Sequence, residues 1–237
     1  MHRISMLVIA LMLQTAVRAE GITVQKSEGD VKVRQGVTEV WNKVVSGDVL
    51  RPHDTMRTGP NGSAILLVSM DAGGAAKRIA LPAQVIVDMS DIRNLTQEEL
   101  MLKITMEKVR ASSSEWRSNE LHIPNAAVVH GEDRGSGAPA AENDRQVGQL
   151  LLNGARVLFD NGFYATTVLR TMEVFRMYPA LGGMFDHRFL LANSMERANL
   201  RGEALAEYSS MSRMEGLTPA QQQVVQGKMD ALRAERH

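Results

Sequence analysis

The hydrophobic period of this chain changes once, near its middle, and the change divides the chain into two parts that must fold differently. Before residue 129, apolar and polar residues alternate in short runs, as at 22–24 and 31–33, which is the period of a half-buried strand. From Arg145 onward, apolar residues recur every three or four positions, which is the period of one helical face. The predicted fold class is therefore α+β and multidomain, with an all-β sandwich or barrel-like domain followed by an α-helical hairpin repeat domain.

The first part, residues 20–129, is a series of short apolar runs separated by turn residues. Glycine–aspartate pairs at 29–30 and 47–48 and a Gly-Pro-Asn-Gly stretch at 59–62 mark turns, because glycine and asparagine tolerate positive φ. Strands with such turns are typical of a compact β-domain. The runs predicted as strands are 22–24, 31–33, 44–45, 49–50, 56–58, 64–68, 78–81, 85–87 and 100–109.

A stretch rich in glycine, alanine, proline and charge, residues 130–144, separates the two parts. It holds too little apolar surface to order itself and is predicted to be a flexible linker. Residues 145–237 are predicted to form helix–turn–helix pairs, with one helix ended by Gly162 and the next stopped by Pro179. Thr218 is the predicted N-cap of the last helix, and a proline follows it at the first helical position.

The start of the chain has the pattern of an export signal, with a basic pair at 2–3 followed by an apolar run at 4–13. The run is shorter than the roughly 20 residues that a membrane-spanning helix needs, and small residues follow it. We expect residues 1–19 to be a signal peptide, with cleavage after Ala19. An uncleaved anchor is the alternative, against which Arg18 and the short run argue. The expected location is periplasmic or secreted, with no integral membrane segment after cleavage.

Charge and composition exclude several classes of partner and site. The chain has 27 basic and 27 acidic side chains, so it has no overall field to attract nucleic acid, and we predict no nucleic-acid partner. The absence of cysteine excludes disulfides, iron–sulfur clusters and thiolate zinc sites. Aromatic residues make up 4% of the chain, too few for a binding platform of stacked rings.

Several short motifs of the β part keep one order along the chain: 29–31, Trp41, 47–50, 54–59 and 61–64. Together they resemble the FecR domain, a periplasmic module best known from iron-transport signalling. The resemblance implies a periplasmic β-domain, and Trp41 is predicted to anchor its core. Residues 123–132 stand where the family closes, but they lack its arginine and threonine. Signalling members also carry a membrane helix and a cytoplasmic segment, which we do not find here, so no anti-sigma role is expected.

The helical part is similar to degenerate tetratricopeptide repeats. One repeat of about 34 residues is indicated by Ala155, Gly162, Tyr164 and Pro179. A second repeat is suggested by Ala192, Ala204 and Tyr208, with the last helix as a cap. Two repeats and a cap are fewer than the roughly three that usually stand alone, so docking onto the β-domain or a partner is expected to complete the core.

No group of residues has the pattern of a catalytic or metal site. The six histidines do not lie at metal-ligand spacing from one another. Asp48 and Asp54 are predicted to bond their own turn backbone rather than serve as a paired acid and base. The glycine-rich turn before Ser63 lacks the Gly-x-Ser-x-Gly spacing of a nucleophile elbow. We therefore predict no catalytic residue, no metal ligand, no cofactor and no enzymatic activity.

The predicted function is that of an exported, soluble, non-enzymatic binding or interaction protein of the bacterial cell envelope. Its β-domain and helical repeats are expected to engage an envelope protein or polymer. One alternative is a structural or assembly factor for a surface polymer or secretion system, and another is an envelope hydrolase without a recognisable motif. Any binding site on the β-domain is expected near the turn that follows residue 58, at Arg57, Thr58, Asn61 and Ser63.

Overall fold

The structure is a computed structural model that describes residues 21–69, 76–120 and 140–234. The predicted signal peptide at 1–19 and the closing segment at 123–132 lie outside the described residues. Most of the predicted linker also lies outside them, but its last residues, 140–144, are helical. None of the described helices is long and apolar enough to cross a membrane.

The β part is a sandwich of two antiparallel sheets, with strand orders β4-β1-β6-β7 and β3-β2-β5-β8. Alternate residues of both sheets point into one buried core, for example Val24 and Leu66 from the first sheet and Val33 and Met56 from the second. The α+β class is therefore confirmed. The strands are β1 (Ile22–Glu28), β2 (Val31–Arg34), β3 (Trp41–Lys43), β4 (Val49–Leu50), β5 (Thr55–Thr58), β6 (Ser63–Val68), β7 (Lys77–Leu81) and β8 (Val85–Asp88).

Two of the predicted strands are wrong. The run at 44–45 lies just beyond β3, where Val44 is buried but its backbone is irregular. The run at 100–109 lies in helix α1 (Gln97–Glu120). Its apolar residues alternate along the chain, and on a helix alternate residues lie about 200° apart. As a result Leu100 and Ile104 are buried against the helical core, while Leu102 is exposed on the opposite face.

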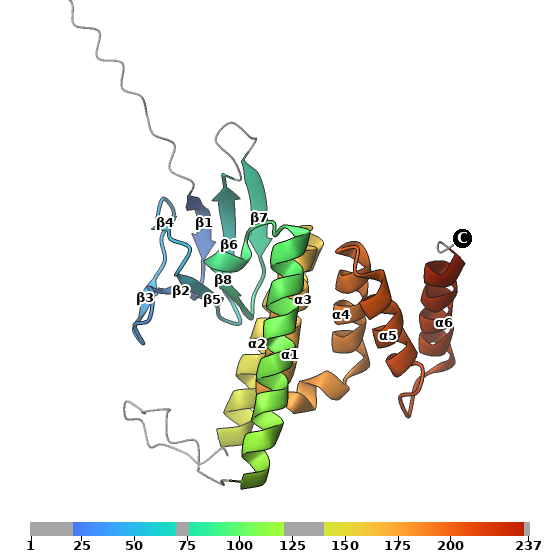
Figure 1. Ribbon diagram of the computed structural model, residues 1–237. Helices are drawn as coiled ribbons and strands as arrows, with labels where there is room; N and C mark the ends of the chain where they lie inside the picture. Colours follow the sequence, from blue (N-terminus) through green and yellow to red (C-terminus); the bar gives the residue numbers. More distant parts are fainter. Residues whose placement is uncertain (1–20, 70–75, 121–139, 235–237) are drawn as a thin grey trace, which may run out of the picture.

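The helices after α1 form at the predicted positions and follow one another in antiparallel hairpins (Figure 1). Gly162, with φ +81°, makes the left-handed turn that ends the first of them. Thr218 caps the last: its Oγ1 accepts from the Gln221 N–H at 3.2 Å, and its own N–H donates to Gln221 Oε1 at 2.9 Å. These elements are α2 (Ala140–Asp160), α3 (Tyr164–Met177), α4 (Phe185–Arg197), α5 (Arg201–Met211) and α6 (Pro219–Ala234), with 3₁₀ turns η1 (Met89–Asp91) and η2 (Pro179–Gly183).

The helical part docks on the sandwich along its edge strand β8. The approach of α2 is so close that a Cβ on Gly154 would lie 1.9 Å from the carbonyl oxygen of Ile86. Asn153 donates from Nδ2 to the Gln84 carbonyl at 2.8 Å. Leu158 and neighbouring apolar side chains extend the sandwich core into the helices. Docking therefore covers an edge that would otherwise expose unpaired backbone groups.

Candidate binding surface

The four residues predicted as a binding site do not lie together. Arg57 is exposed on β5, but Thr58 beside it is 1% exposed and faces the core. The Thr58 hydroxyl donates to the Pro82 carbonyl at 2.7 Å and accepts from the Val85 N–H at 3.0 Å. Thr58 therefore ties β5 to the start of β8 and is unavailable to a partner.

Asn61 and Ser63 belong to a turn that packs against another turn. The Gly59 N–H donates to the Asp30 carbonyl at 2.7 Å. Gly29, with φ +68°, leaves no room for a side chain, because a Cβ there would lie 1.9 Å from the Asn61 carbonyl oxygen. Asn61 is exposed at the tip and Ser63 is half-buried at the start of β6. Glycine is needed here for the fit between the two turns, so the motif is explained by structure alone.

Arg57 does belong to an aligned set of cations on the outer face of the second sheet. It stands directly opposite Lys32 on β2, and Lys32 stands directly opposite Lys43 on β3. All three side chains are exposed. We call Lys43, Lys32 and Arg57 the basic row. Within the part of the chain that the structure describes, only Lys32 has a carboxylate partner, Asp30 at 3.2 Å.

The basic row does not stabilise the sheet. Neighbouring strands lie about 4.8 Å apart, so the three cations occupy a line roughly 10 Å long. Like charges directly opposite each other on paired strands are destabilising. An anionic chain laid along the line would relieve this repulsion, and salt would screen the interaction because the side chains are in solvent.

A second row on the same face adds an aromatic ring and hydrogen-bond donors. The Arg34 guanidinium lies 5.5 Å from the centre of the Trp41 ring and donates to Thr55 Oγ1 at 3.3 Å. Trp41 is half-buried on the edge strand β3, so its prediction as a core anchor is wrong. A hollow of about 520 Å³ lies beside Arg34, with His53 and Asp88 on its walls. Arg34 Nε is buried without a hydrogen-bond partner.

The sandwich and the helices are joined by a buried charge cluster around Arg170 of α3. Its guanidinium donates to Asp91 of η1, to Asp88 of β8 and, at 2.9 Å, to Glu173. Burial lowers the pKa of Arg170, but the charges of Asp91 and Asp88 outweigh that effect and raise it above its ordinary value. The N–H groups of Arg170 are occupied by these carboxylates, so the cluster has a structural role. We call Arg170, Asp88 and Asp91 the joint between the sandwich and the helices.

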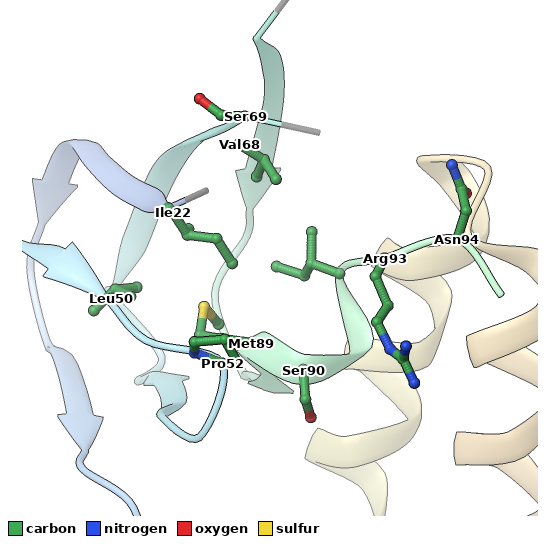
Figure 2. Close-up of a pocket in the computed structure, with 11 residues that line it drawn as sticks. Ile22, Leu50, Pro52, Val68, Ser69, Met89, Ser90, Arg93 and Asn94 are labelled. Atoms are coloured by element: carbon green, nitrogen blue, oxygen red, sulfur yellow. The ribbon is translucent and has the colours of Figure 1, made fainter. Parts of the chain in front are cut away.

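A separate hollow of about 330 Å³ opens at the end of the sandwich opposite the Asn61 turn. Figure 2 shows Ile22, Leu50 and Met89 around it, with Arg93 at its side. Arg93 is paired with Glu99 at 2.5 Å. The walls suit a small apolar group. They come from four segments of the chain, which is why no local motif in the sequence indicates the hollow.

The residues weighed for catalysis have structural partners. Asp48 accepts from the Val45 N–H at 2.9 Å and Asp54 from the Arg51 N–H at 2.8 Å, which confirms both as turn aspartates. His187 is buried with Nδ1 3.0 Å from the Leu181 carbonyl oxygen. Among the described residues, no three histidine or carboxylate side chains are placed to hold a metal ion.

No protein-family model, curated protein or solved structure matches this chain. The resemblances to the FecR domain and to tetratricopeptide repeats therefore remain predictions.

Proposed function

We propose that this protein is an exported, non-enzymatic binding protein of the cell envelope that holds an anionic envelope polymer on its β-sandwich. The observation that carries the proposal is the register of the basic row, which puts Lys43, Lys32 and Arg57 side by side on three neighbouring strands. A local row of this kind attracts an acidic chain even though the protein as a whole is close to neutral.

The neighbouring groups suit the same class of ligand. Arg34 and Trp41 lie on the same face as the basic row and offer a donor and a flat apolar surface. The hollow beside Arg34, whose walls also carry Asp54 and Asp88, is large enough to hold a sugar ring. Each exposed ion pair contributes only about 0–1 kcal/mol, so tight binding needs several sugar residues at once. An acidic polysaccharide that carries regularly spaced carboxylates fits this requirement.

The helical hairpins supply a second surface, at a distance from the first. In Figure 1, α5 and α6 lie far from both sheets, while α2 lies beside β8. A chain that holds a polymer at one end and presents hairpins at the other is suited to bring a protein to that polymer. This arrangement is the specific observation that favours an assembly factor as the second candidate function.

Calorimetric titration of the purified protein with a polyuronate, at low and at physiological salt, tests the proposal. We expect binding that weakens with salt, and a loss of about tenfold in affinity when Lys43→Ala and Arg57→Ala are combined. Arg78→Ala is the matched control, because Arg78 is an exposed arginine on β7 of the other sheet. Equal affinity of the double variant and the control variant, or no binding at low salt, contradicts the proposal.

A further inference from the structure

The hollow beside Arg34 has a floor of polar side chains that hold one another in place. Arg34, Thr55 and Asp88 stand directly opposite one another on β2, β5 and β8. The Arg34 guanidinium donates to Thr55 Oγ1 at 3.3 Å, and the Thr55 hydroxyl donates to Asp88 Oδ1 at 2.5 Å. Arg170 holds the other carboxylate oxygen of Asp88 from the helical side. A ligand in the hollow would meet polar groups that are already ordered, which reduces the entropy lost on binding.

The walls above this floor carry polar groups that are free to bind. His53, in the loop between β4 and β5, and Ser90, in η1, are exposed and line the hollow. Neither the His53 ring nor the Ser90 hydroxyl is hydrogen-bonded to another residue that the structure describes. An imidazole and a hydroxyl can each donate and accept. Apolar surface from Val37 and Pro52 completes the walls. A few placed polar groups beside apolar surface, in about 520 Å³, are typical of a site for a small ligand group.

The charge of the hollow differs from that of the basic row. Asp54 and Asp88 lie in its walls, and Arg34 is the one arginine or lysine among the described residues that line it. A carboxylate placed here would meet two like charges, which is unfavourable. An uncharged sugar presents hydroxyls instead, and a hydroxyl both donates to a carboxylate and accepts from an arginine or a serine. The hollow therefore suits a neutral sugar better than a charged one.

We infer that the polymer held by the basic row is a mixed one, in which an uncharged sugar beside a charged sugar occupies the hollow next to Arg34. Arg34 and Thr55 lie two residues along their strands from Lys32 and Arg57, on the same face of the sheet. Two residues of a strand span about 7 Å, so one chain can contact the row and the hollow together. This inference rests on the proposed function, because the charged sugars still need the basic row.

Calorimetric titration with two probes of equal length tests the inference. One is a hexasaccharide that alternates a uronate with an N-acetylhexosamine, and the other is a hexamer of a single uronate. We expect the alternating probe to bind at least about threefold more tightly at physiological salt, because salt screens the exposed ion pairs but not the hydrogen bonds in the hollow. Its affinity should fall about tenfold when His53→Ala is combined with Ser90→Ala, whereas the affinity of the uronate hexamer should not change.

Control variants separate this inference from the proposed function. Lys43→Ala combined with Arg57→Ala should weaken the binding of both probes, and Arg78→Ala on the other sheet should weaken neither. The combined His53→Ala and Ser90→Ala variant should keep the native circular dichroism, because both side chains are exposed.

Three results overturn the inference and leave the proposed function standing. They are an unchanged affinity of the hollow variant for the alternating probe, an equal loss of affinity for both probes, and wild-type protein that binds the uronate hexamer at least as tightly as the alternating probe. Failure of both probes to bind at low salt contradicts the proposed function itself.

Discussion

Arg170 of α3 holds Asp91, which lies just beyond the last strand of the sandwich, through two donors: Nε at 2.8 Å and Nη2 at 2.6 Å from the same carboxylate oxygen. Both side chains are mostly buried, and Asp88 shares the guanidinium. This contact spans the two parts of the chain. It fixes the sheet that carries the basic row against helix α3.

Removing the Arg170 guanidinium is expected to destabilise the folded protein. In Arg170→Ala, the carboxylates of Asp88 and Asp91 lose their partner in a poorly solvated place, so we expect a loss of about 3 kcal/mol in the free energy of unfolding. Urea denaturation measures this loss. Lys26→Ala is the control, since it breaks a pair with Glu28 in which both side chains are more than half exposed, and it should cost less than about 1 kcal/mol. Equal losses would show that the joint is not a major source of stability.

Gly154 should not accept a side chain. A Cβ there would meet the Ile86 carbonyl oxygen at 1.9 Å, and a backbone atom cannot move aside, so Gly154→Ala should destabilise the protein by about 1–3 kcal/mol. Gly227→Ala is the matched control on α6, where a Cβ meets nothing within 4 Å. That substitution should stabilise the protein by about 0.5–1 kcal/mol through helix propensity. Thermal unfolding of both variants checks the opposite signs, and a neutral Gly154→Ala would refute the close docking of α2.

The free energy of unfolding is expected to depend on pH through the carboxyl group of Glu107. Burial raises the pKa of its carboxyl, but hydrogen bonds from Arg110 and Arg176 outweigh burial and hold the pKa below its ordinary value of 4.5. The group therefore stabilises the fold above pH 4.5, and this contribution is lost as the pH falls through the lower folded pKa. Glu107→Gln should destabilise the protein at neutral pH, and its deficit relative to wild type should shrink in acid. A deficit that is constant from pH 7 to pH 3 would contradict this assignment.

Much of the fold follows from sequence because local patterns agree with tertiary packing. The alternation at 31–33 produces a strand whose two valines face the core, and the continuous apolar run at 64–68 also forms a strand, although only Ala64, Leu66 and Val68 of that run are buried. Gly162 and Thr218 mark helix ends by chemistry that acts within a few residues. Helix α1 was misread because the same alternation, wound on a helix, gives two opposite apolar faces. Only the packing on α3 decides that this segment is a helix.

The binding surface was harder to predict. Arg57 is a sequence candidate, but the basic row also needs Lys32 and Lys43, and only the strand register brings these three together. Trp41 was expected in the core because large aromatic residues usually bury there, yet it lies on a three-residue edge strand beside Arg34. The hollow near Ile22 joins four distant segments, a juxtaposition that no local pattern can indicate.

Amide chemical shifts during titration with an acidic polysaccharide would locate the ligand directly. We predict that the largest changes fall on Lys43, Lys32 and Arg57 and fade as salt is added, while Arg78 on the other sheet stays unchanged. Changes confined to α4–α6, or changes that are indifferent to salt, would contradict the proposal that the basic row is the binding surface.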